Sequence, residues 1–128
     1  MRACINRGSY ADAVVLFTLA SSYGRFDMAR VPDQSAWNAM QVLQMQYLQD
    51  VTPAQKAGFN KAAEAMLQNR SDICVKLGKL GPPDYVPTYM IQHGMAAFTK
   101  TSKNGGLVQD FNEQSAWAEV LRDYAHCD

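Results

Sequence analysis

Helix-capping patterns stand directly in front of apolar runs of helical period at several places in this chain of 128 residues. In the clearest pattern the Thr52 hydroxyl and the Gln55 amide can bond the end N–H groups of a helix, and Pro53 suits its first position. Comparable patterns begin at Ser9, Asp33 and Asp110. No alternation of apolar and polar residues persists along the chain, so no strand is expected. The sequence therefore predicts an all-α fold.

The expected helices are joined by short connections. We expect the first helix over residues 10–23, because Gly24 follows it as a typical stop signal. The next runs from Pro32 to about Gln49, and the third begins at Thr52. Ser71 is expected to cap a short helix that Gly81 ends, one further helix spans 89–98, and the last begins at Asp110. Residues 1–128 are therefore expected to form a single helical domain, an irregular antiparallel bundle of five or six helices.

Charge and hydropathy argue against two classes of partner. The chain has twelve basic and twelve acidic residues, so it lacks the net positive charge that attracts nucleic acids and anionic membranes. Its longest nearly unbroken apolar run, residues 13–20, is far shorter than the roughly 20 residues that a membrane helix needs. We expect neither nucleic-acid binding nor a membrane span.

One expected helix has an unusual composition. Residues 34–49 contain no charged side chain and five glutamines. A solvated surface helix normally carries Lys and Glu on its outer face. The segment is therefore expected to be either central in the fold or part of an interface.

The first two expected helices resemble Sel1-like and tetratricopeptide repeats. The resemblance covers about one repeat, residues 10–42, and depends on Ala13, Phe17, Ala20 and Gly24 at a small-aromatic-small spacing. No second copy follows at the period of these families. The resemblance implies a protein-binding scaffold.

The three cysteines bear on the cellular compartment in which the protein is expected to work, because disulfides form mainly in oxidising compartments. Cys4 and Cys127 lie near the ends and Cys74 on an expected helix, a distribution suited to a disulfide between Cys74 and either Cys4 or Cys127. The alternative is three reduced thiols in a cytoplasmic protein. A disulfide favours an exported, periplasmic protein. Because no apolar signal core follows Met1, such a protein is expected to have lost its leader, and Met1 would not be its native start.

The sequence contains no recognisable catalytic motif. His93 and His126 are the only histidines, and neither has a nucleophile or a set of metal ligands beside it in sequence. Asp27 and Asp33, like Glu113 and Glu119, are interpreted as surface and capping groups. We expect no cofactor, no metal and no catalysis. A small enzyme that uses His93 is the least favoured alternative.

A small, neutral, helical domain without a catalytic motif suits protein binding. In size, helical content and cysteine use the chain resembles the exported immunity proteins with which bacteria neutralise antibacterial toxins, although no motif carries the resemblance. The alternative is a cytoplasmic helical adaptor or structural protein. The expected contact is the proline-bounded loop 82–89, through Asp84, Tyr85 and Tyr89, since rigid aromatic side chains often anchor interfaces. If the tyrosines instead seal the bundle, the contact is expected on the helix around Trp37 and Gln41.

Overall fold

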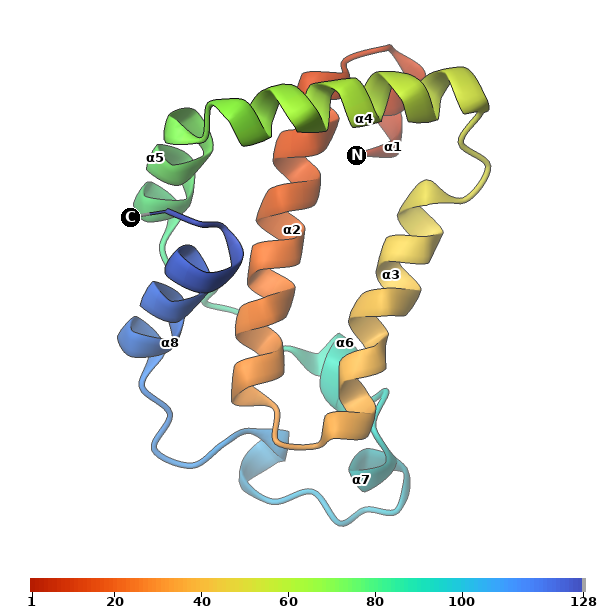
Figure 1. Ribbon diagram of the computed structural model, residues 1–128. Coiled ribbons are helices and arrows are strands. Elements are labelled where there is room, and N and C mark those ends of the chain that lie inside the picture. The colour runs from red at the N-terminus through yellow and green to blue at the C-terminus, as the bar shows by residue number, and fades with distance from the viewer. Residues whose placement is uncertain (128) are drawn as a thin grey trace.

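A computed structural model describes residues 1–127, and this part of the chain is all-α, as predicted (Figure 1). No helix in it is both long enough and apolar enough to cross a membrane. The α-helices are α1 Arg2–Asn6, α2 Tyr10–Arg30, α3 Asn38–Leu48, α4 Pro53–Gln68, α5 Ser71–Leu80, α6 Thr88–Ile91, α7 Met95–Phe98 and α8 Glu113–Glu119. Two 3₁₀ turns, η1 Gln34–Trp37 and η2 Asn104–Gly106, and a π-helical turn, η3 Val120–Tyr124, complete the secondary structure of the described residues.

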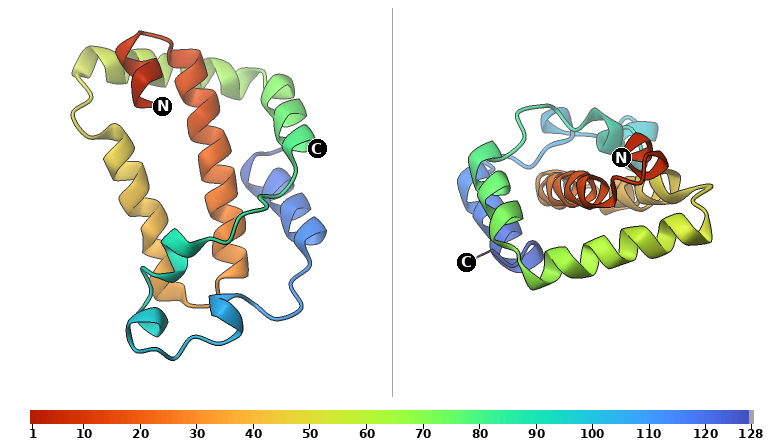
Figure 2. Two further views of the ribbon diagram at one scale, coloured as in Figure 1. Left: turned by 180° about the vertical axis from the view of Figure 1, so that it is seen from behind. Right: turned by 90° about the horizontal axis from the view of Figure 1, so that it is seen from above.

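The long helix α2 is the centre of the arrangement. Helix α3 runs beside it in the opposite direction, and α8 lies on its other side (Figure 1). Helix α4 crosses the N-terminal half of α2, where the rings of Phe17 and Phe59 meet edge to face at 5.7 Å. On the opposite side of α2, the segment between α5 and α6 crosses its C-terminal half (Figure 2).

Within residues 1–127, the buried apolar side chains form three small clusters in place of one large core. The first joins α2, α5 and α8 through Phe26, Leu77 and Trp117. The second lies at the C-terminal end of α2, around Val31 and Met90, and the third holds α1 against α2. Each cluster includes residues of α2 or of its C-terminal end, so this helix connects all three.

Gly24 does not end the first long helix, and that prediction is wrong. Helix α2 continues to Arg30, and Pro32 follows it. A Cβ at position 24 would collide with the Sδ and Cε atoms of Met40. Gly24 therefore leaves room on α2 for the side chain of Met40 from α3.

The expected helix over 89–98 is divided into two single turns. The break comes at Gly94, the N-cap of α7, and a Cβ there would collide with the Asp33 carboxylate. Asp33 accepts the backbone N–H groups of Ser35 at 3.1 Å and Ala96 at 2.9 Å, so it caps η1 and α7 together. The interpretation of Asp33 as a capping group is confirmed.

The other capping predictions have mixed outcomes. Thr52 and Gln55 form the expected capping box at the start of α4. In contrast, Asn112 and not Asp110 caps α8: the Asn112 side chain accepts the N–H of Ser115 at 2.9 Å, while Asp110 lies two residues before the cap. Ser71 is the first residue of α5 and makes no capping hydrogen bond; its hydroxyl donates to the Asn69 side chain instead.

Candidate functional site

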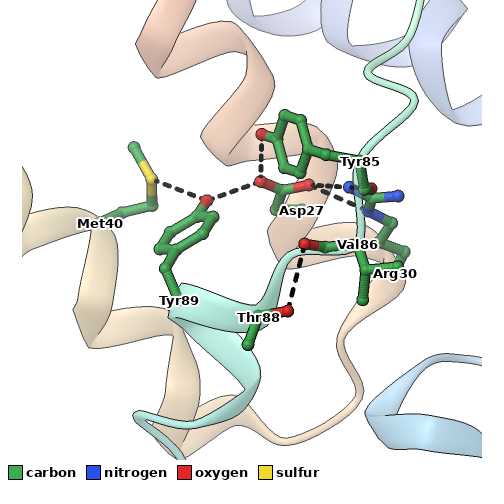
Figure 3. A network of polar contacts seen from close by, with 7 residues as sticks. All are labelled: Asp27, Arg30, Met40, Tyr85, Val86, Thr88 and Tyr89. Carbon is green, nitrogen blue, oxygen red and sulfur yellow. Dashed lines mark hydrogen bonds and ion pairs between the residues drawn. The ribbon is translucent and has the colours of Figure 1, made fainter.

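A completely buried carboxylate is the centre of the candidate site. Asp27 lies on α2, and its Oδ1 accepts hydrogen bonds from Nε of Arg30 at 2.9 Å and from Nη2 at 2.7 Å. Its Oδ2 accepts the hydroxyl groups of Tyr85 at 2.7 Å and Tyr89 at 2.6 Å (Figure 3). A buried carboxylate needs a cation and several donors to replace water, and Asp27 has both.

Arg30 lies one helical turn after Asp27 and is also buried. Besides the carboxylate, its Nη2 donates to the backbone oxygen of Tyr85 at 2.9 Å. Its guanidinium lies 5.0 Å from the ring centroid of Phe26 and 5.3 Å from that of Tyr85. The ion pair therefore binds both the backbone and the side chain of a segment that is distant in sequence.

That segment, residues 81–91, is called the strap. It begins at Gly81, whose φ of 67° suits glycine, and Pro82, Pro83 and Pro87 restrict its backbone. Pro87 is fully buried and precedes α6. Three prolines and the bonds to Asp27 and Arg30 hold the strap in one conformation across α2.

The strap residues predicted to contact a partner remain partly at the surface. Tyr85 is 39% exposed and Tyr89 is 37% exposed, although both hydroxyl groups point inward to Asp27. Between them Val86 is exposed, as is Asp84 ahead of them. Both tyrosines therefore fold back onto the bundle through their hydroxyl groups and still present ring surface to solvent.

Burial, followed by the hydrogen bond to Asp27, raises the pKa of both Tyr85 and Tyr89 above the ordinary value of 10.0. Both hydroxyl groups are therefore protonated donors at neutral pH. Burial and the charge of Asp84 also raise the pKa of Tyr23. The whole tyrosine cluster is thus uncharged in physiological conditions.

The exposed surface continues from the strap along α2. Leu16, Ala20, Tyr23 and Asp27 recur at spacings of four, three and four residues, which places them on one side of the helix. The rings of Tyr23 and Tyr85 lie 6.3 Å apart, and Leu16 and Ala20 are exposed. The candidate site is therefore the strap together with this side of α2.

The interpretation of Asp27 as a surface group is wrong. The sequence indicates only that Asp27 can form an ion pair: Arg30 lies three residues later on a helix, a spacing that lets the two side chains meet. Surface ion pairs share this spacing, so it does not reveal burial. The tyrosines that close the network are 58 and 62 residues away in sequence, and no local pattern connects them to Asp27.

Cys74 and Cys127 form a disulfide with a Cα–Cα distance of 5.6 Å, so the second of the two predicted pairings is the one present. Cys4 is a buried free thiol. His93 is exposed in the turn after α6, and His126 is exposed beside the disulfide. Among residues 1–127 no group of three or more His, Cys, Asp or Glu side chains could hold a metal ion.

A separate cavity of about 540 Å³ lies beyond the C-terminal end of α2. Val31, Ile91 and Leu107 contribute apolar surface to its lining, and Lys103 and Asn104 contribute polar groups. None of the residues predicted to contact a partner lines it.

Comparison of the chain with protein-family models, with curated proteins and with solved structures finds no match.

Proposed function

We propose that this chain is a non-catalytic protein-binding domain whose contact surface is the strap and the adjoining side of α2. In its most specific form the proposal is an immunity protein that occludes an antibacterial toxin in the periplasm. The observation that carries the proposal is the pair of half-exposed tyrosines, Tyr85 and Tyr89, held in place by a buried carboxylate.

Rigid tyrosines suit a contact surface for two reasons. A side chain that is already ordered loses less conformational entropy on binding, so less free energy opposes association. The tyrosine ring also buries a large apolar area, and Tyr is enriched among the residues that dominate binding energy. Because Asp27 holds both hydroxyl groups, Tyr85 and Tyr89 would contact the partner mainly through ring surface.

The chemistry of this surface indicates the chemistry of its partner. The centre is apolar, formed by Val86 and the two tyrosine rings, and Asp84 adds one negative charge; the exposed Leu16 lies further along α2. Such a surface is complementary to an apolar patch that carries a basic residue at its rim. The disulfide supports an oxidising compartment, where an exported toxin would be met; reduced thiols would have favoured the cytoplasmic adaptor.

The test makes the same substitution, Val→Asp, at two exposed positions: one in the strap and a control on α5. Val86→Asp places a carboxylate at the centre of the strap, where the wild-type side chain is 62% exposed; Val75→Asp makes the same change on α5, where the side chain is 53% exposed. Immobilised wild-type protein and both variants are incubated with periplasmic extract of the native host. We expect one protein to be retained by the wild type and by Val75→Asp, and Val86→Asp to weaken its binding at least about 30-fold.

The captured protein is then produced alone in a bacterial periplasm. We expect growth arrest that the wild type and Val75→Asp relieve and Val86→Asp does not. Equal retention by all three proteins would contradict the strap as the contact surface. A captured partner without toxicity would contradict the immunity function and favour the adaptor.

A further inference from the structure

Helix α3 lies at one edge of the molecule and packs through one side only. Its inward side carries Ala39, Met40 and Gln44. The Met40 sulfur lies 3.6 Å from the Tyr89 hydroxyl, and the Gln44 amide lies 3.4 Å from the Ser21 hydroxyl. Ala39 is the only residue of α3 that is fully buried. Helix α3 is therefore not central in the fold, whereas Ala36, just before it in the uncharged segment, is fully buried in the second cluster.

The outward side of α3 carries a regular seam. Asn38, Val42 and Met45 follow one another at spacings of four and three residues, and all three are exposed. This spacing places them in one line along the helix and is the repeat by which paired helices interlock their side chains. Gln41 and Leu48, both exposed, flank the line. The outward side thus has the pattern of a helix that pairs with a second helix.

The chemistry of the seam suits a copy of itself. A two-fold axis places the same patch of both molecules face to face, so a charged group near the axis would meet its own charge. No charged residue lies between Asp33 and Asp50. The amide of Gln or Asn is both donor and acceptor, and two identical amides can therefore bond each other. Apolar Val42 and Met45 at the centre, with amides around them, form a self-complementary surface.

The molecule also exposes more surface than its size requires. A folded monomer of 14.2 kDa is expected to expose about 6,800 Å². This chain exposes 8121 Å². The excess is larger than the roughly 800 Å² that each partner loses in an interface of standard size.

We infer that the outward side of α3 is the interface of a symmetric dimer of this chain, in which the two copies of α3 pair along the seam through Val42 and Met45. The strap lies outside this interface, so the dimer is independent of the proposed toxin contact. Dimerisation would leave one tyrosine surface on each copy.

Sedimentation equilibrium over about 1–200 µM tests the inference with a matched pair of substitutions. Met45→Lys introduces two like charges beside the two-fold axis, where the wild-type side chain is 67% exposed; Met95→Lys makes the same change on α7, where it is 58% exposed. We expect the wild type and Met95→Lys to dimerise with the same dissociation constant. Met45→Lys should raise that constant at least about 30-fold.

Gln41→Glu is a second variant, nearly identical in shape to the wild type. We expect this variant to form a weaker dimer than the wild type at neutral pH. The dimer should regain its affinity near pH 4, where the introduced carboxylate is protonated. A wild type that stays monomeric at 200 µM would overturn the inference, as would a dimer unaffected by Met45→Lys and Gln41→Glu. Val86→Asp should leave the dimer intact, so failure of the dimer and failure of the strap contact are separate results.

Discussion

At Asp27 one side chain connects parts of the chain that are distant in sequence. A buried ion pair by itself adds little stability, because removing both charges from water costs about as much as their attraction returns. The tyrosine hydroxyl groups change this balance, since each replaces a water molecule that Asp27 has lost. Loss of one donor leaves the charge in place and under-solvated, so its effect should exceed that of an ordinary surface hydrogen bond.

Tyr89→Phe removes one such donor and keeps the ring. We expect it to lower the free energy of unfolding by about 2 kcal/mol, measured by urea denaturation. Tyr47→Phe is the matched control: Tyr47 is equally exposed and, among residues 1–127, makes no side-chain hydrogen bond. It should change stability by less than about 0.5 kcal/mol. Equal effects of the two substitutions would show that the bond to Asp27 contributes nothing.

The raised pKa values of Tyr85 and Tyr89 predict a loss of stability at alkaline pH. Below pH 10 both tyrosines are protonated in the folded and unfolded states, so their contribution is complete. As the pH rises above 10, the unfolded chain loses these protons while the folded protein retains them, which favours unfolding.

We therefore expect the wild-type free energy of unfolding to decrease above pH 10 more steeply than that of the variant with Tyr85→Phe and Tyr89→Phe together. Urea denaturation at several pH values between 9 and 11 measures the difference. Parallel curves for the two proteins would contradict a raised pKa. Tyr47→Phe provides the control, because this tyrosine lies outside the network.

At the scale of the secondary-structure element, helix α4 depends on local stabilisation more than helix α2 does. It has no fully buried residue, whereas α2 has several. Its first turn is closed by Thr52, which accepts the Gln55 N–H at 3.2 Å, and by the Gln55 side chain, which accepts the Thr52 N–H at 3.0 Å. A helix with little burial should be sensitive to such a cap.

Thr52→Ala should lower the free energy of unfolding by about 1 kcal/mol, since one end N–H of α4 loses its partner. Thr52→Ser keeps the hydroxyl and should restore most of that stability. Hydrogen exchange of the amides in the first turn of α4 provides a local measurement. Unchanged exchange in Thr52→Ala would show that packing against the neighbouring helices, and not the cap, holds this turn.

The same contrast explains which elements the sequence predicts. The start of α4 is encoded within four residues, 52–55, so it can be read directly. Helix α2 continues through Gly24 although glycine is a common stop signal, and the break at Gly94 comes with a capping contact from Asp33, which is distant in sequence. The site divides in the same way: Tyr85 and Tyr89 are recognisable from their prolines, but Asp27 becomes visible only when the strap crosses α2.

At the scale of the whole molecule, burial is distributed over three small clusters, and one covalent link reinforces the largest. The disulfide joins α5 to the segment after η3 across 53 residues. Arg70 adds a hydrogen bond from its guanidinium to the backbone oxygen of Ala125 at 3.2 Å. Both Cys74 and Cys127 pack against the cluster that contains Phe26 and Trp117. The link therefore holds the C-terminal segment over the cluster that α2 and α8 share.

Loss of this link should be the largest single effect on stability. Closing a loop of 53 residues corresponds to about 4 kcal/mol in the loop-entropy model. Domains of this size have about 5–15 kcal/mol in total, so a chain with Cys74→Ala and Cys127→Ala should be only marginally folded. Urea denaturation followed by tryptophan fluorescence measures the loss, and Cys4→Ala controls for removal of a thiol.

This result also bears on the compartment. If the double variant loses about 4 kcal/mol, the protein depends on an oxidising environment, which agrees with a periplasmic partner. If it loses less than about 1 kcal/mol, the reduced chain is stable enough for the cytoplasm, and the adaptor becomes the better hypothesis.

Because the disulfide lies on α5 and the C-terminal segment, its loss should leave the α3 dimer intact wherever the chain remains folded. A dimer lost together with the disulfide would show that the α3 surface depends on the fold of the whole molecule.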